Sequence, residues 1–201
     1  MVIRQKGETI GVMPASEISM KGEHNLENVL AATCAAYLSG LSVRSVRRTI
    51  QNFKGVEHRL ERVGVHDGVT YYNDSKATNV ESAKRALQAF SRPVVLIMGG
   101  RDKSGDFEQL ADLVKERVRR LILMGEAAAK IAAVLGSSAP VSEAENLEES
   151  VCEAGRSASR GDTVLLAPGC ASFDMFDGYE HRGREFKKSV ARFIHHQGAS
   201  N

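Results

Sequence analysis

The segment Tyr71-Tyr72-Asn73-Asp74-Ser75-Lys76-Ala77-Thr78-Asn79 joins a strand pattern to a helix pattern. Upstream, Val69 and Tyr71 follow the period-two pattern of a half-buried strand. Downstream, apolar residues recur at three- and four-residue spacing, which is typical of a helix: Val80, Ala83, Leu87 and Phe90. The segment therefore predicts a strand-to-helix corner.

This corner carries groups that suit an anionic ligand. Its free backbone N–H groups and the positive end of the helix attract negative charge, and Lys76 adds a primary amine. The simpler interpretation is that Asp74, Ser75 or Thr78 only caps the helix. A carboxylate, two hydroxyls, an amine and two carboxamides lie within seven residues, however, and this density favours a binding site.

Strand and helix patterns alternate from the corner to the C-terminus. Strands are expected near residues 62–66, 69–72, 94–98, 120–124, 140–141 and 163–166, with Asp67-Gly68 as a hairpin turn. Helices are expected near residues 79–90, 107–118, 126–135 and 147–157, with a last helix ending near Ile194. The runs 94–98 and 164–166 are continuously apolar, as in strands covered on both faces. This pattern predicts an α/β fold with a mostly parallel sheet between helices.

The first part of the chain has a different pattern. Short strands are expected near residues 2–4 and 9–12. A helix is expected at 25–38, with Leu30 on its apolar side, and a second helix at 43–53, with Ser42 as its N-cap. Lys54-Gly55-Val56 breaks the pattern and is the candidate linker. We therefore expect two domains, residues 1–54 and 55–201.

Composition narrows the class of protein. The 201 residues are 42% hydrophobic and 26% charged with a net charge of +2, which gives no argument for nucleic acid or a membrane as partner. Three scattered cysteines, Cys34, Cys152 and Cys170, form neither a disulfide framework nor a zinc motif. No apolar run approaches the roughly 20 residues of a membrane helix. These features predict a cytoplasmic protein.

Polar clusters follow three of the expected strands. They are Asn73 to Thr78, Gly99-Gly100-Arg101-Asp102-Lys103-Ser104, and Ala167-Pro168-Gly169-Cys170-Ala171-Ser172-Phe173-Asp174. In open α/β sheets, ligands bind beyond the carboxyl ends of the strands. We therefore expect the clusters to form one anion pocket; no GxGxxG motif supports a dinucleotide site.

The order of several motifs is similar to that in the Mur ligases. These motifs are His24-Asn25-Leu26-Glu27-Asn28, His58-Arg59, Asn73-Asp74-Ser75-Lys76-Ala77-Thr78-Asn79, Gly99-Gly100-Arg101-Asp102-Lys103, and Pro168-Gly169-Cys170-Ala171-Ser172-Phe173-Asp174 with Tyr179-Glu180-His181-Arg182-Gly183. The chain most resembles the D-glutamate-adding branch of that family, over nearly its whole length. The resemblance implies a Rossmann-like C-terminal domain, preceded by the tail end of the central ATPase domain in residues 1–54.

The resemblance is incomplete in one respect. Ligases of this family have a UDP-sugar domain and a central ATPase, but the chain contains no GxxxxGK[ST] phosphate loop. The resemblance therefore implies that the phosphate loop, the magnesium ligands and a modified lysine belong to a part upstream of these residues. No metal ligands are expected in the chain itself, which we expect to be inactive alone.

The resemblance implies roles for two sets of residues. Contacts to the ATP nucleotide are implied for Asn25, Asn28, Arg59 and Asp74. A D-glutamate site is implied at Thr78, Lys103, Ser172, Phe173 and Tyr179, with Lys103 as the cation for a carboxylate. Lys76 is the candidate catalytic residue, placed to stabilise phosphate or acyl-phosphate charge.

Simpler interpretations stand beside these roles. Asn25 and Asn28 could be surface residues, Lys103 a solvated lysine in a turn, and Ser172 a helix cap. Phe173 and Tyr179 could be core aromatics, which sequence physics alone favours. His181 and Arg182 are expected in structural or hydrogen-bonding roles, Cys170 as a small packed residue, and His195 and His196 in a frayed tail.

The implied reaction is ATP-dependent amide formation in peptidoglycan precursor synthesis. ATP, with Mg²⁺, would phosphorylate the carboxylate of UDP-N-acetylmuramoyl-L-alanine, and the amine of D-glutamate would attack the acyl phosphate. Two alternatives remain open. One is a related ligase such as a folylpolyglutamate synthase, and the other is a non-catalytic binding module.

Overall fold

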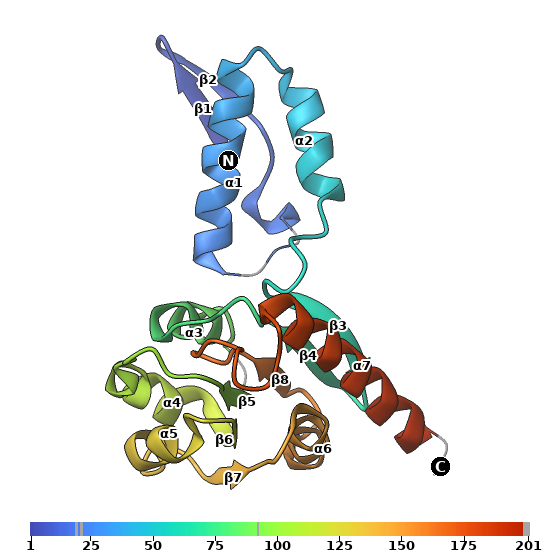
Figure 1. Ribbon diagram of the computed structural model, residues 1–201. Coiled ribbons are helices and arrows are strands. Elements are labelled where there is room, and N and C mark those ends of the chain that lie inside the picture. Colours follow the sequence, from blue (N-terminus) through green and yellow to red (C-terminus); the bar gives the residue numbers. More distant parts are fainter. Residues whose placement is uncertain (19, 21, 92, 199–201) are drawn as a thin grey trace. The chain divides into compact units, whose positions relative to one another are not determined.

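The computed structural model describes residues 1–18, 20, 22–91 and 93–198. The chain divides into two compact units, Met1–Gly55 and Val56–Asn201, and the break falls inside the expected linker Lys54-Gly55-Val56 (Figure 1). Each unit is described by itself.

Unit 1 is a hairpin with two helices. Strands β1 (Val2–Gln5) and β2 (Glu8–Gly11) pair antiparallel, and a short 3₁₀ helix, Ala15–Glu17, precedes α1 (Glu23–Leu38) and α2 (Val43–Asn52). Ser42 caps α2, since its Oγ accepts a hydrogen bond from the Ser45 N–H at 3.2 Å. Leu30, expected on the apolar side of the first helix, is 43% exposed, whereas Val29 and Val46 are buried.

Unit 2 contains a six-stranded sheet in the order β3-β4-β8-β5-β6-β7. Its strands are β3 (Glu61–His66), β4 (Val69–Asn73), β5 (Val94–Gly99), β6 (Val118–Met124), β7 (Val141–Glu143) and β8 (Thr163–Leu166). Edge strand β3 is antiparallel to β4, and every other pairing is parallel. The β3–β4 turn is Asp67-Gly68, with positive φ at both residues (48° and 77°), as expected for a two-residue hairpin.

Helices cover both faces of this sheet (Figure 1). They are α3 (Val80–Gln88), a 3₁₀ turn (Phe107–Leu110) continued by α4 (Ala111–Arg117), α5 (Ala128–Leu135), α6 (Leu147–Ser157) and α7 (Tyr179–Gly198). None of the described helices is long and apolar enough to cross a membrane. The expected α/β fold with a mostly parallel sheet is confirmed.

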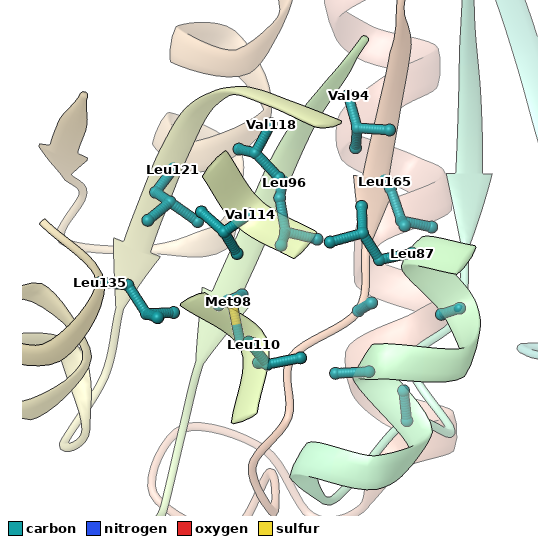
Figure 2. Close-up of a cluster of buried hydrophobic side chains, with 14 of the residues drawn as sticks. Leu87, Val94, Leu96, Met98, Leu110, Val114, Val118, Leu121, Leu135 and Leu165 are labelled. Carbon is teal, nitrogen blue, oxygen red and sulfur yellow. The ribbon is translucent and has the colours of Figure 1, made fainter. Parts of the chain in front are cut away.

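The apolar run of β5 explains how the two layers are built. Leu96 and Met98 point into the core under α3, α4 and α5, where Leu87 also packs (Figure 2). The alternate residues Val95 and Ile97 point into the second core, under α6 and α7. Side chains of a strand alternate between faces, so a strand covered twice must be apolar throughout.

Three local expectations are corrected by the structure. Helix α3 is capped by Asn79, whose Oδ1 accepts from the Ser82 N–H at 2.8 Å, rather than by Asp74, Ser75 or Thr78. The helical pattern at residues 107–118 begins as a 3₁₀ turn and ends at Arg117. His195 and His196 lie inside α7, which continues to Gly198 and is not frayed at Ile194.

Candidate functional site

Three loops leave the carboxyl ends of neighbouring parallel strands and meet at one edge of unit 2. They comprise residues 73–79 from the end of β4, residues 99–106 from the end of β5, and residues 167–178 after β8. The strand order places β8 between β4 and β5, so the three loops are adjacent. This arrangement brings together the polar clusters recognised in the sequence, at the edge where α/β sheets bind ligands.

Two glycines allow the loops to approach closely. Gly99 and Gly100 have φ of 123° and 125°. A Cβ on Gly99 would lie 1.8 Å from the Met124 carbonyl oxygen, and one on Gly100 would lie 2.2 Å from that of Ala171. Only glycine fits at such positions. The approach allows Arg101 and Ala171 to exchange backbone hydrogen bonds of 2.9 and 3.0 Å, which join the second loop to the third.

Arg182 of α7 links all three loops. Its guanidinium is fully buried and donates to the Ser75 Oγ (3.0 Å), the Ser75 carbonyl (3.0 Å) and the Cys170 carbonyl (3.1 Å). Longer contacts reach the carbonyls of Ala171 (3.4 Å) and Gly99 (3.5 Å). The expectation of a hydrogen-bonding role for Arg182 is thus confirmed.

Asn73 and His58 form a second buried connection. The Asn73 side-chain N–H₂ lies 3.0 Å from His58 Nδ1 and 3.1 Å from Glu61 Oε2, while its Oδ1 accepts from the Ser75 N–H at 3.1 Å. Burial lowers the pKa of His58 below its usual value, so the ring is neutral at neutral pH and Nδ1 acts as the acceptor. The pair therefore joins β4 to the segment that opens unit 2.

The segment that opens unit 2 also contains a group that could hold a metal ion. Glu57, His58 and Glu61 are the only such group among the described residues. The Lys187 ammonium already donates to both carboxylates, and His58 Nδ1 faces Asn73. Mg²⁺ prefers several oxygen ligands in octahedral geometry, so this group does not fit a magnesium site.

Asp74 is a buried carboxylate at the corner after β4. It is 7% exposed, and its Oδ1 accepts a hydrogen bond from the Leu60 N–H at 3.2 Å. Burial raises the pKa of the Asp74 carboxyl to about 6, while the Leu60 N–H and the charge of Arg59 oppose that rise. The two residues expected to contact the nucleotide from this unit, Arg59 and Asp74, therefore interact electrostatically.

Lys76 extends from the same corner into solvent. Its Nζ lies 5.3 Å from the centre of the Tyr179 ring, within the range of a cation–π interaction. Tyr179 is half-buried at the start of α7 and makes an edge contact with the ring of His58, 6.2 Å between centres. The expectation that Tyr179 is a core aromatic is therefore wrong. Thr78, two residues beyond Lys76, is half-buried.

Lys103 differs from the cations around it. Arg101 pairs with Glu126 at 2.9 Å and Lys130 pairs with Asp102 at 2.6 Å. Lys103 is exposed and forms no ion pair with any residue that the structure describes. Its ammonium is therefore available to a ligand carboxylate.

The third loop presents Ser172 and Phe173. Ser172 is buried, and its carbonyl oxygen accepts from the Met175 N–H at 3.2 Å and the Phe176 N–H at 2.9 Å. It lies seven residues before α7, so the expectation of a helix cap is wrong. Phe173 is 59% exposed and is not a core aromatic. Asp174 fixes the loop instead, because its Oδ2 accepts from the Glu126 N–H at 3.1 Å.

The remaining candidates have mixed outcomes. In unit 1, Asn28 is exposed but Asn25 is 6% exposed, so only Asn28 fits a surface residue. Cys170 is buried, and burial raises the pKa of its thiol to about 12, which agrees with a packed, unreactive residue. The sequence did not single out Asn73 or His58 for the hydrogen bonds that they make.

The family of the chain is shown by comparison with known proteins. A family model described as Mur ligase, glutamate ligase domain, matches residues 58–170. The chain belongs to the Mur ligase family. The resemblance inferred from the sequence motifs is therefore confirmed.

Curated members of the Mur ligase family resemble the chain over most of its length. It is 48% identical over 189 residues to the UDP-N-acetylmuramoylalanine–D-glutamate ligase of Acidobacterium capsulatum, covering 94% of the chain and 40% of that protein. The Salinibacter ruber protein of the same name is 44% identical over 195 residues, covering 96% and 42%. The chain thus spans about two fifths of the length of these relatives.

Solved structures share the fold at low sequence identity. A pseudomurein peptide ligase type C from Methanothermus fervidus matches with a TM-score of 0.70 and 18% identity, covering 95% of the chain and 39% of its own. The Mycobacterium tuberculosis folylpolyglutamate synthase complexed with ADP matches with a TM-score of 0.63 and 18% identity, covering 86% and 41%. These likenesses show that the chain shares its fold with parts of both enzymes.

Proposed function

We propose that the chain is the amino-acid-binding part of an ATP-dependent ligase that adds D-glutamate to UDP-N-acetylmuramoyl-L-alanine. The reaction would supply a peptidoglycan precursor. Support for D-glutamate comes from the names of relatives that are 44–48% identical over most of the chain. Support for an anionic amino acid comes from the charges at the edge of the sheet.

The observation that carries the proposal is the pair of available lysines at this edge. Lys76 lies in the loop after β4 and Lys103 in the loop after β5, and neither ammonium is ion-paired with a described residue. The neighbouring cations Arg101 and Lys130 are already neutralised by carboxylates. Two available cations on loops that leave the same edge of the sheet suit a ligand with carboxylate and phosphate groups.

Each residue then has a distinct role in the proposed reaction. Lys103 binds a carboxylate of D-glutamate, and the Ser172 hydroxyl and the Phe173 backbone donate hydrogen bonds to the same amino acid. Thr78 and Tyr179 border the amino acid. Lys76 stabilises negative charge as phosphate leaves the tetrahedral intermediate.

The chemistry is a phosphoryl transfer followed by an acyl transfer. The γ-phosphoryl group of ATP moves to the acceptor carboxylate, giving ADP and an acyl phosphate. The D-glutamate amine attacks the acyl carbon, inorganic phosphate leaves, and the nitrogen loses a proton. Catalysis depends chiefly on positioning and charge stabilisation.

We infer nucleotide contacts at two places in the chain. Asn25 and Asn28 would contact ATP from unit 1, which we assign to the end of the central ATPase domain. Arg59 and Asp74 would contact it from unit 2. Mg²⁺ is expected to be bound by the part of the ligase that carries the phosphate loop, since no fitting group occurs among the described residues here.

Two other functions make different predictions. A folylpolyglutamate synthase shares the fold, but it would require L-glutamate and a folate acceptor in place of the UDP-sugar. A non-catalytic module would bind an amino acid without turnover. The reading frame upstream of Met1 separates either ligase from the binding module, because an ATP-dependent ligase requires a phosphate loop there. The amino acid and the acceptor that are used then separate the two ligases.

The proposal is tested by phosphate release in the full-length polypeptide, meaning this chain with the residues encoded upstream. ATP, magnesium, UDP-N-acetylmuramoyl-L-alanine and D-glutamate are supplied together, and each is then left out in turn. We expect release only with all four, and none from the 201-residue chain alone. Ligation by the chain alone, or release independent of D-glutamate, would contradict the proposal.

A further inference from the structure

The Arg182 side chain combines two properties that rarely occur together. It is fully buried, yet all of its hydrogen-bond acceptors are neutral: one hydroxyl and four backbone carbonyls. A cation removed from water without a carboxylate partner is costly. Burial accordingly lowers the pKa of Arg182 to about 10, although the group stays charged at neutral pH.

The acceptors of Arg182 are distributed over the three loops of the candidate site. Ser75 precedes Lys76 in the chain, Cys170 precedes Ser172 by two residues, and Gly99 opens the loop that carries Lys103. Arg182 also lies three residues after Tyr179 on α7. One guanidinium therefore contacts the backbone beside each group of residues proposed to bind substrate.

Ser75 completes this connection. Its hydroxyl accepts from Arg182 Nε at 3.0 Å and donates to the Tyr179 carbonyl at 2.8 Å. The loop after β4 is thereby fixed to the first turn of α7 from two sides. A movement of Arg182 would therefore displace both Lys76 and Tyr179, which contact each other through the Tyr179 ring.

We propose that Arg182 is a positioning residue that sets the relative placement of the three substrate-binding loops. The inference rests on the proposed function for its kinetic consequence, but its structural part stands alone. Arginine is required because its planar guanidinium has five donors in fixed directions. A lysine would keep the charge but could not reach three loops at once.

A purely stabilising role predicts a different response to substitution. If Arg182 only stabilised the core, Arg182→Lys would weaken all of unit 2 together. If it positions the loops, the loops would loosen while the central strands stay protected. Hydrogen exchange separates these cases, because the amides of Lys76, Arg101 and Ala171 are hydrogen-bonded and therefore measurable.

The first experiment compares amide exchange in the 201-residue chain and its Arg182→Lys variant. We expect the amides of Lys76, Arg101 and Ala171 to exchange about tenfold faster or more, since hydrogen bonds to a charged group are lost. Amides of β5 and β6 should be unchanged. Arg119→Lys is the matched control, because Arg119 pairs with Asp162 at the opposite edge of the sheet; it should leave the three loops unchanged.

A milder variant covers the case in which Arg182→Lys does not fold. Ser75→Ala removes only the hydroxyl between Arg182 and Tyr179, and should accelerate exchange of the Lys76 amide while leaving β5 and β6 protected. Unchanged loop amides in the variants that fold would overturn the inference. Equal acceleration in loops and strands would overturn it as well.

The second experiment measures KM values in the full-length polypeptide. We expect Arg182→Lys to raise the KM for D-glutamate about tenfold or more, with a smaller effect on the KM for the UDP-sugar, and Arg119→Lys to change neither. An unchanged KM for D-glutamate would contradict a role in the amino-acid site. If the unsubstituted polypeptide adds no D-glutamate, the proposed function fails, and the exchange experiment alone decides the role of Arg182.

Discussion

The Lys76 ammonium lies 5.3 Å from the centre of the Tyr179 ring, so a cation from the loop after β4 contacts the first residue of α7. Such contacts contribute about 0.5–1 kcal/mol at exposed sites. The contact restricts the long lysine side chain without neutralising its charge. Lys76 is thereby held near the sheet edge while remaining able to bind an anion.

Removing the Lys76 charge is expected to lower turnover. In the full-length polypeptide, Lys76→Met should reduce kcat by roughly 100- to 1000-fold, the usual cost of one preorganised electrostatic group. Steady-state phosphate release measures the effect. Lys115→Met, at an exposed lysine of α4 without an ion pair to any described residue, is the control. A kcat within twofold of the parent would remove Lys76 from the catalytic role.

Lys103 is expected to act on amino-acid binding instead. Lys103→Ala should raise the KM for D-glutamate by roughly 10- to 150-fold, because a charge-assisted hydrogen bond to a charged substrate is lost. The KM for ATP should change little, and Lys115→Ala should change neither. Equal increases in both KM values would show that Lys103 does not act selectively on D-glutamate.

The buried carboxyl of Asp74 predicts a pH dependence of stability. Its pKa is raised from 3.8 to about 6 by burial, so the folded chain binds a proton more tightly than the unfolded chain. Stability is therefore lost as pH rises from about 4 through about 6. The shift corresponds to about 3 kcal/mol at neutral pH.

Asp74→Asn keeps the shape and removes this titration. At neutral pH we expect the free energy of unfolding of the variant to exceed that of the parent by up to about 3 kcal/mol. At a pH low enough to protonate Asp74 in both the folded and the unfolded parent, the two free energies of unfolding should be equal. Urea unfolding across this pH range is the measurement. A variant less stable than the parent at neutral pH would show that the buried Asp74 carboxylate does not destabilise the folded chain.

Gly183 of α7 packs against His58 and should not tolerate a side chain. A Cβ there would lie 2.3 Å from His58 Nδ1. We expect Gly183→Ala to lower the free energy of unfolding by about 1–3 kcal/mol through overpacking. Gly198→Ala, on the same helix with no atom within 4 Å of the new Cβ, is the control. Equal stabilities for the two variants would argue against the close packing.

The boundary between the units predicts a site of proteolysis. Lys54 precedes the break after Gly55, so limited trypsin digestion should cut there first and leave a folded fragment that begins near Glu57. Mass spectrometry and circular dichroism identify the fragment. First cleavage within residues 94–124 would show that the boundary is misplaced.

Sequence patterns predicted the strands of unit 2 well because burial on two faces leaves a strong signal. The runs around Leu96 and Leu165 are apolar throughout, and both strands are found. Helix ends were less predictable. Asn79 caps α3 although three other polar residues nearby were plausible caps, since the choice depends on where the backbone turns.

The site was predicted in part. The positions after three strands predicted that the loops with Lys76, Lys103 and Ser172 meet at one edge of the sheet, and the strand order confirms this arrangement. Burial could not be read from the sequence. Arginine is usually exposed, so a buried Arg182 hydrogen-bonded only to neutral groups has no local signal. Phe173 shows the opposite failure, because an aromatic residue is exposed where sequence physics favoured the core.

Selection of D-glutamate by these loops is measured by a competition between amino acids. The full-length polypeptide is given ATP, magnesium, UDP-N-acetylmuramoyl-L-alanine and equal amounts of D-glutamate, L-glutamate and L-lysine, and the products are identified by chiral analysis and mass spectrometry. We expect the D-glutamyl product in an excess of roughly 100-fold or more, as for a site built on matched polar contacts. A predominant L-glutamyl or lysyl product would contradict it.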